Sequence, residues 1–262
     1  MKQESLSRTL LVAISVVFVC SLLVSSTVSL LRPIQNARKA PQQLRYILLT
    51  AGLLQGKDNI QNIASLLEGV ETRILDLSRA EFVSDIDAQG YDYRKRFGDP
   101  SATATIDKRD DLAQLGRRPN YMPIYWIHNP SSKAKLVMPV YGKGMWSMIF
   151  GYIALEQDFN TIAGIYFYEQ AETPGIGDRI QDANWLAGWQ GKRLYDAKGS
   201  LALNISKLLT SDSLLAAHQV DSISGATKTV DGVANLVHYW LGDKGYRPFL
   251  EKQRIALQEA DE

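Results

Sequence analysis

The chain has 262 residues, with 29 lysines and arginines against 28 acidic residues, and a single cysteine. A formal charge of +1 provides no field that would hold a polyphosphate, so we expect no nucleic acid partner. One cysteine cannot form an intramolecular disulfide or a cysteine-rich metal site, so the fold must depend on an apolar core. Hydrophobic residues make up 45% of the chain, which excludes an intrinsically disordered protein.

The N-terminal region contains a long apolar run. Residues 9–31, TLLVAISVVFVCSLLVSSTVSLL, carry no charge and no proline. At about 1.5 Å per residue the run reaches roughly 34 Å, enough to cross a hydrocarbon core of about 30 Å. We predict a transmembrane helix, preceded by a cytoplasmic N-terminus at 1–8. A cleaved secretory signal is the alternative, because Lys2 and Arg8 precede the run and small hydroxyl residues 25–27 lie near its end.

The charges that flank this run bear on its orientation. Arg32, Arg38, Lys39 and Arg45 follow it, whereas two basic residues precede it. The count of lysines and arginines on the two sides therefore predicts that the following domain stays in the cytoplasm. A long domain can cross a membrane regardless of its flanking charges, so the count does not decide the orientation alone.

Residues 32–119 are predicted to form a helical and irregular part of a soluble domain. Apolar residues recur at helical spacing over 44–54 and over 63–74, which predicts two amphipathic helices separated by residues 56–58. From 85 to 119 charges and turn residues dominate, and we expect an irregular surface connection. There the basic residues 94–96 are expected to face solvent, balanced by Asp85, Asp87 and Asp92.

The pattern changes to strands in the part that spans 120–262. Short runs rich in isoleucine, valine, tyrosine and phenylalanine occupy 121–128, 135–142, 147–156 and 161–170. Turn residues separate them, so they predict four consecutive strands of an antiparallel sheet. Helical patterns at 181–190 and 229–241 then predict helices packed on one face, which gives an α+β fold.

Three segments of this part contain residues suited to a cofactor. DSISGATKT at 221–229 precedes a predicted helix, and its hydroxyls, glycine and backbone N–H groups favour a bound phosphate, although ordinary helix capping uses the same residues. ETPGIG at 172–177 would let the backbone approach a flat ligand, with Ile176 against a ring, or would form a rigid turn. GKGMWS at 142–147 places Trp146 beside an aromatic cofactor or in a core.

The order of four motifs makes the pattern specific. G-x-G-x-W-S, Y-E-Q-x-E-T-P-G-x-G, D-x-x-S-G-A-T-x-T and W-L-G-D-x-G occur in this order. They resemble the C subunit of the bacterial sodium-translocating NADH:quinone reductase, over the anchor and about residues 120–250. The resemblance implies that a flavin transferase attaches FMN through its phosphate to Thr227, with Thr229 as the second candidate. Lys228 departs from the family pattern, which has an apolar residue there.

The resemblance also implies the surroundings of a covalent FMN. We expect Glu172, Thr173 and the backbone of residues 175–177 to hydrogen-bond its ring or ribityl chain, while Trp146 and Ile176 line the ring. Lys207 or Lys228 would neutralise the phosphate. The residues around the attachment point would be Ser224, Gly225, Ala226 and Thr229. We expect no residue of this chain to be catalytic by itself, and no metal site, because the three histidines show no metal-ligand spacing.

The function that the resemblance implies is that of a covalent-FMN electron-carrier subunit. The complex would oxidise NADH, reduce ubiquinone and pump sodium ions out of the cell, with other subunits, a flavin transferase and the lipid bilayer as partners. The chain would cross the bacterial inner membrane once and place its soluble domain in the periplasm, against the count of flanking charges. No dinucleotide fingerprint and no charge within the apolar run point to an NADH, quinone or sodium site in this chain.

Two alternatives stay open at this point. The G subunit of the related ferredoxin:NAD oxidoreductase complex has a similar anchor and S-G-A-T segment. A non-redox, membrane-anchored binding module would use the S-G-A-T segment only as a helix cap.

Overall fold

The computed structural model describes residues 6–54, 66, 69–128, 134–207 and 212–260. The chain forms two compact units, Met1–Leu44 and Arg45–Glu262.

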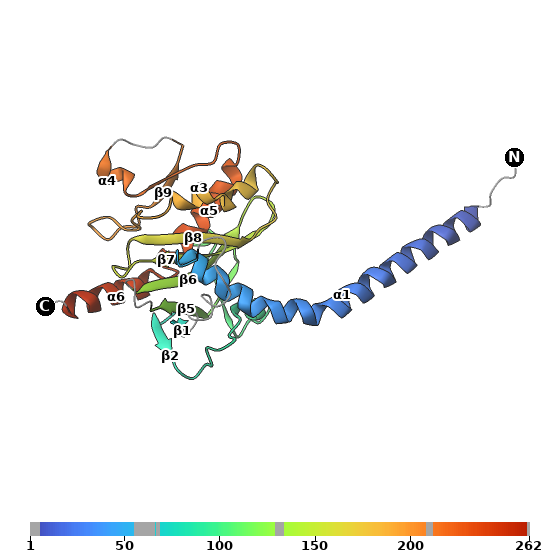
Figure 1. Ribbon diagram of the computed structural model, residues 1–262, viewed down its shortest axis with the longest axis horizontal. Coiled ribbons are helices and arrows are strands. Elements are labelled where there is room, and N and C mark those ends of the chain that lie inside the picture. Colours follow the sequence, from blue (N-terminus) through green and yellow to red (C-terminus); the bar gives the residue numbers. More distant parts are fainter. Residues whose placement is uncertain (1–5, 55–65, 67–68, 129–133, 208–211, 261–262) are drawn as a thin grey trace. The chain divides into compact units, whose positions relative to one another are not determined.

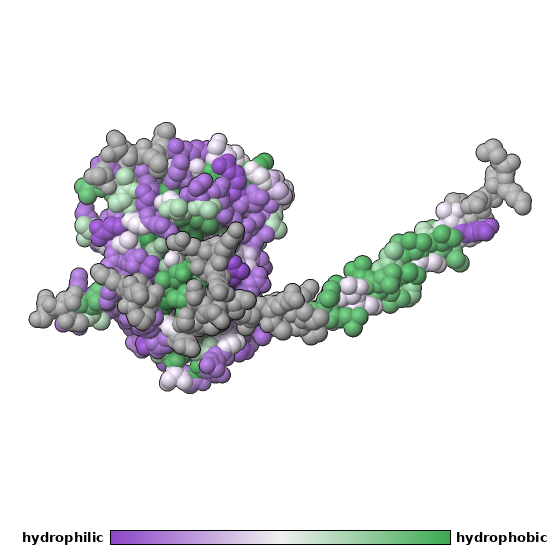
Figure 2. All heavy atoms as spheres, in the orientation of Figure 1, coloured by the Kyte–Doolittle hydropathy of each residue, from purple (hydrophilic) through white to green (hydrophobic). Residues whose placement is uncertain are grey.

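The first helix, α1, spans Leu6–Thr50. Its segment Ser7–Leu31 is the one helix among the described residues that is long and apolar enough to cross a membrane, and its side chains are exposed. Figure 2 shows apolar atoms along this segment. The hydroxyls of Ser15, Ser26 and Thr27 donate to carbonyl oxygens one turn earlier, so each is satisfied within the helix, as a bilayer requires. The predicted apolar helix is confirmed.

A six-stranded antiparallel sheet forms the centre of the second unit, in the order β2-β1-β5-β6-β7-β8 (Figure 1). Its strands are β1 Val70–Asp76, β2 Glu81–Val83, β5 Tyr121–Ile127, β6 Lys135–Lys143, β7 Met148–Leu155 and β8 Ile162–Glu169. The predicted antiparallel sheet is confirmed, and its four predicted strands correspond to β5 to β8. β6 and β7 are buried along almost their whole length, because other elements cover both faces of the sheet there.

Helix α5, Thr227–Trp240, packs directly on β6. A Cβ atom at Gly142 would lie 2.6 Å from the Leu236 Cβ, and one at Gly232 would lie 2.7 Å from the Lys143 carbonyl oxygen. The glycines therefore let the helix approach the strand closely. The Trp240 indole N–H also donates to the carbonyl of Tyr141 at 2.7 Å. This contact holds the C-terminal end of α5 against β6.

Shorter elements complete the second unit. β3 Thr103–Thr105 and β4 Arg117–Pro119 form an antiparallel pair, and β9 Asn204–Ser206 and β10 Gln219–Asp221 form a parallel pair. The remaining helices are η1 Tyr93–Arg96, η2 Gly177–Gln181, α3 Ala183–Ala187, α4 Ser213–Ala216 and α6 Arg247–Ala260.

The helix predicted over 63–74 is wrong from Val70 onward, where the chain forms β1. Ile74 and Leu75 are buried in the sheet, because β1 pairs with both β2 and β5. The apolar spacing of such a short run fits a helix and a strand equally well. Residues 56–58 and most of the segment before Val70 lie outside the described residues.

The region 85–119 also differs from the predicted irregular surface connection. It contains η1, β3 and β4, and it contributes the buried side chains of Tyr93 and Ala113 to the core. Arg94 forms two hydrogen bonds to the Glu169 carboxylate (2.7 and 2.8 Å) and lies 4.0 Å from the ring centroid of Phe150. Its charge is therefore paired with Glu169 at the end of β8 and not with the nearby aspartates.

The helix predicted at 181–190 is shorter than expected, and α6 was not predicted.

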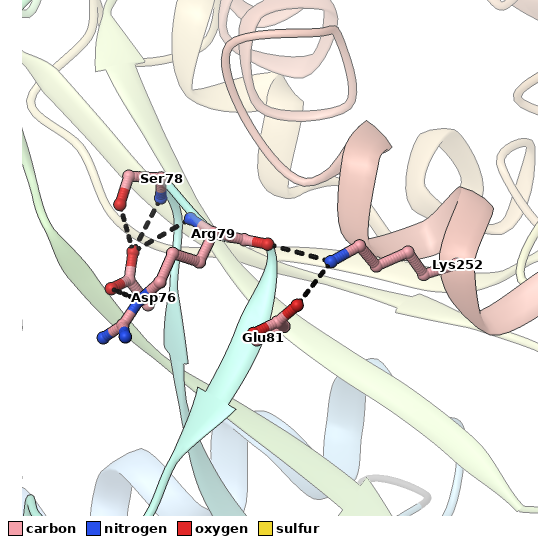
Figure 3. Close-up of polar contacts among 5 residues, drawn as sticks. All are labelled: Asp76, Ser78, Arg79, Glu81 and Lys252. Atoms are coloured by element: carbon pink, nitrogen blue, oxygen red, sulfur yellow. Dashed lines mark hydrogen bonds and ion pairs between the residues drawn. The ribbon is translucent and has the colours of Figure 1, made fainter.

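The turn between β1 and β2 is closed by Asp76 (Figure 3). Its Oδ1 accepts from the Ser78 N–H (2.8 Å), the Ser78 hydroxyl (2.6 Å) and the Arg79 N–H (3.2 Å), while Oδ2 accepts from Arg79 Nε (2.8 Å). Burial raises the pKa of Asp76, but the bonds from Ser78 and Arg79 outweigh it and bring the pKa to about 2. Lys252 of α6 donates to the Arg79 carbonyl (3.0 Å) and to Glu81 (2.8 Å), which ties α6 to this turn.

Candidate functional site

The start of α5 is formed by the segment that the sequence predicts as a phosphate site. The Ala226 N–H donates to the Ile223 carbonyl at 3.2 Å, and Gly225 between them has φ +84°. Glycine suits this left-handed conformation because it has no Cβ atom. Ala226 is the N-cap of the helix, and no side chain caps it. The alternative of ordinary side-chain capping is therefore wrong for this N-cap, and the first N–H groups of α5 are available to an anion.

The two candidate threonines have opposite surroundings. Thr227, the first residue of α5, is exposed. Thr229 is only 3% exposed, and its hydroxyl donates to Glu172 Oε2 at 2.7 Å. The burial and the hydrogen bond withhold the Thr229 hydroxyl from a modifying enzyme, whereas the Thr227 hydroxyl can be reached.

The Glu172 carboxylate, 4% exposed, lies in a cluster of donors. Oε1 accepts from the N–H groups of Trp146 and Ser147 (3.1 Å each) and from the Ser147 hydroxyl (3.2 Å). Oε2 accepts from the Met145 N–H (3.1 Å) and from the Thr229 hydroxyl. Burial raises the pKa of Glu172, but the hydrogen bonds from Thr229 and from the three N–H groups outweigh this effect. The pKa of Glu172 is therefore below its ordinary value, and the carboxylate is ionised at neutral pH.

Two loops meet beside this carboxylate and expose apolar side chains. The Trp146 indole N–H donates to the Thr173 hydroxyl at 3.1 Å, and the indole is 63% exposed. The Thr173 carbonyl accepts from the N–H groups of Ile176 (3.1 Å) and Gly177 (2.8 Å), which closes the loop over Gly175 at φ +74°. Ile176 is 46% exposed. The alternative that Trp146 belongs to the core is therefore wrong, and its ring can contact a ligand.

Glycines make the close packing of this site possible. A Cβ atom at Gly144 would lie 2.6 Å from Glu172 Oε1, and one at Gly177 would lie 2.8 Å from both the Glu172 Cβ and the Thr229 hydroxyl oxygen. Any larger residue would displace the carboxylate or the start of α5.

The lysines of the site lie around the start of α5. Lys207 follows β9, whose last residue, Ser206, accepts a hydrogen bond from the Ser222 N–H at 2.9 Å. Lys207 is thus next to the segment that leads to Ser224 and Thr227, and Lys228 is exposed in the first turn of α5.

The sequence prediction missed Ser147, whose hydroxyl also accepts from the Ala171 N–H at 2.8 Å. Its place in G-x-G-x-W-S was the available signal.

The structure therefore brings the three predicted segments together. Hydrogen bonds connect Trp146 to Thr173 and connect the Met145–Ser147 turn, through Glu172, to Thr229. Ser224, Gly225 and Ala226 lead directly into Thr227. Whether these residues contact a cofactor stays a prediction.

Comparisons with known proteins agree with this site. A family model described as an FMN-binding domain matches residues 144–242, a range that begins at Gly144 and includes all of α5. The C subunit of the Na(+)-translocating NADH-quinone reductase from Pseudomonas aeruginosa is 38% identical over 254 residues, 96% of this chain and 97% of the relative. The same subunit from Neisseria meningitidis serogroup B is 37% identical over 255 residues, 97% of this chain and 96% of the relative. The chain belongs to this family of C subunits.

A solved structure supports the membership of this family. The crystal structure of NqrC from Shewanella oneidensis matches with a TM-score of 0.75 and 35% identity, and the match covers 84% of this chain and 99% of that chain. Of the two related complexes considered from the sequence, the membership favours the sodium-translocating NADH-quinone reductase. It also identifies the chain as a subunit of an oxidoreductase complex.

The described residues fit a covalently attached FMN. Its phosphate requires an exposed hydroxyl, which Thr227 provides, and unpaired N–H donors, which the uncapped start of α5 provides. Its ring requires an apolar or aromatic surface, and the exposed side chains of Trp146 and Ile176 provide one.

Proposed function

We propose that this chain is the covalent-FMN electron carrier of a membrane complex that oxidises NADH, reduces ubiquinone and moves sodium ions out of the cell. The family membership and the FMN-binding domain support this proposal. The observation that carries it is the exposed Thr227 hydroxyl at the uncapped start of α5, next to a buried Thr229. Bound FMN would supply the redox chemistry, and the residues of this chain would bind and orient it.

The residues of this chain hold the cofactor in the proposed arrangement. Thr227 would carry the FMN phosphate as an ester, and the first N–H groups of α5, together with Lys207 or Lys228, would stabilise the remaining negative charge. Ser224, Gly225 and Ala226 form the turn that presents the threonine.

The two loops that meet at the Trp146–Thr173 contact would hold the ring. Trp146 and Ile176 would provide apolar surface for it, and Thr173 and the backbone at Gly175 would donate or accept its hydrogen bonds. Covalent attachment removes the need for a deep pocket, which leaves the ring open to redox partners.

We further propose that α1 anchors the chain in the bacterial inner membrane, with the second unit in the periplasm beside other subunits of the complex. There a separate flavin transferase modifies Thr227. The apolar segment Ser7–Leu31 supports the anchor, and the family resemblance supports the periplasmic side. An alkaline phosphatase fused to the C-terminus, which is active only outside the cytoplasm, should be active; an inactive fusion would overturn this topology.

The attachment site can be tested on the full chain produced together with a flavin transferase. The wild-type band should fluoresce in a denaturing gel, Thr227→Ala should lose all covalent flavin, and Thr229→Ser, which keeps the buried hydroxyl, should retain it. Trypsin cuts after Lys207 and Lys228, so the peptide 208–228 contains Thr227 and excludes Thr229. Recovery of the FMN mass on the following peptide, 229–244, or on neither peptide, would refute the assignment.

A further inference from the structure

The Glu172 carboxylate connects three segments that are far apart in the sequence. Its donors on the turn between β6 and β7, at Met145, Trp146 and Ser147, precede it by 25 to 27 residues, and Thr229 on α5 follows it by 57 residues. Glu172 itself begins the loop that ends at Gly177. A single side chain thus fixes both loops of the site and the first turn of the helix.

The acceptor capacity of this carboxylate is fully used. An ionised carboxylate offers roughly four lone-pair positions, and Oε1 already accepts three hydrogen bonds while Oε2 accepts two. Gly144 packs against the carboxylate so closely that a Cβ atom there would lie 2.6 Å from Oε1, and a Cβ atom at Gly177 would lie 2.8 Å from the Glu172 Cβ. There is neither a free lone pair nor space for a flavin atom at this side chain.

We propose that Glu172 is a positioning residue, which holds the Trp146 turn, the 172–177 loop and the start of α5 in the arrangement that receives the flavin, without contacting the flavin itself. This inference rests on the proposed function, because the elements that it connects are those proposed to hold FMN. It replaces the expectation that Glu172 hydrogen-bonds the ring. The positioning is built into the flavin-free chain, since every donor belongs to the protein.

Glu172→Gln tests the role with little change in volume. If the glutamine carbonyl keeps the bonds to Trp146 and Ser147, its NH₂ group faces the Met145 N–H, donor against donor. Glu169→Gln is the matched control, because it makes the same change three residues earlier in a half-exposed side chain that pairs with Arg94.

The first measurement is hydrogen exchange in the full chain with Thr227→Ala, which carries no covalent flavin. We expect Glu172→Gln to speed exchange of the amides of residues 145–147 by about tenfold or more, as the loss of hydrogen bonds to a charged group implies, and Glu169→Gln to leave them unchanged. Unchanged exchange in the Glu172 variant would overturn the proposal. This result does not depend on the attachment of flavin, so it is independent of the proposed function.

The second measurement is the visible absorption spectrum and midpoint potential of the flavin in the chain with Thr227 intact. We expect Glu172→Gln to shift both, because the flanking Trp146 moves, and Glu169→Gln to leave both unchanged. A shift here combined with unchanged exchange in the flavin-free chain would instead indicate direct contact between Glu172 and flavin. If wild-type protein carries no covalent flavin, the proposed function fails while the exchange result stands.

Thr229→Val provides a second variant in case Glu172→Gln does not fold. It removes one of the five donors and keeps the side-chain shape. We expect covalent flavin to be retained with a shifted spectrum, because α5 loses its link to the carboxylate. An unchanged spectrum would overturn the positioning role.

Discussion

Two carboxylates in the second unit are buried and ionised, yet they do different things. Asp76 is 5% exposed and Glu172 is 4% exposed, and each accepts several hydrogen bonds. All donors to Asp76 lie within three residues of it, whereas those to Glu172 lie 25 to 57 residues away. Asp76 therefore closes one turn, while Glu172 assembles a site from three segments.

The donors to the two carboxylates also differ in their exposure to solvent, and this difference has an energetic consequence. Ser78 and Arg79, the donors to Asp76, are exposed and can turn to water when the carboxylate is removed. The Thr229 hydroxyl is buried and has no such alternative. A buried donor without a partner bears the full cost of its desolvation, about 1–3 kcal/mol.

The largest expected effect comes from the same truncation at both positions. Glu172→Ala should lower the free energy of unfolding by about 3 kcal/mol, because it leaves the buried Thr229 hydroxyl and N–H groups of the turn unpaired. Asp76→Ala should lower it by about 1–2 kcal/mol, because its donors reach water. Urea unfolding of the two variants at neutral pH measures the difference. Equal losses would show that the burial of the donors to Glu172 has no energetic consequence here.

The same contrast explains what the sequence could predict. The strands β5 to β8 were predicted because each pairs with its neighbour in the sequence and short turns separate them. β1 was not, because its long partner β5 begins 45 residues later, at Tyr121, and nothing near Val70 distinguishes a strand from a helix. Whether such a segment forms a strand or a helix is decided by its pairing with strands that are distant in the sequence.

The site was predicted to a similar extent. The motifs identified Thr227, Trp146 and the loop at Glu172 as neighbours through a family resemblance. The burial of the Glu172 side chain could not be predicted, because it depends on hydrogen-bond donors and glycines from other segments. The burial of Thr229, which separates it from Thr227, depends on the same contact.

A smaller effect is expected from pH. The folded pKa of Asp76, about 2, lies below the ordinary value for aspartate of about 3.9, so its contribution to stability is present above about pH 4 and is lost as the pH falls toward 2. From pH 5 to pH 3 this group alone should cost the wild type about 1 kcal/mol. Asp76→Asn should reduce the difference in unfolding free energy between these two pH values by that amount. An Asp76→Asn variant with the pH dependence of the wild type would contradict the assigned pKa.

The smallest effect on the free energy of unfolding is expected at Lys252. It separates the effect of burial from the effect of distance along the sequence. Lys252 binds the Arg79 carbonyl and Glu81 across more than 170 residues, so its contacts are less local than those of Glu172. Both side chains of the Lys252–Glu81 pair are about half exposed or more, and such pairs contribute roughly 0–1 kcal/mol. Lys252→Met, which keeps the apolar stem, should therefore change the free energy of unfolding by less than about 0.5 kcal/mol, with Lys252→Arg as the charge-retaining control. A loss as large as that of Glu172→Ala would mean that long-range connection, and not the burial of unpaired donors, explains the contribution of Glu172 to stability.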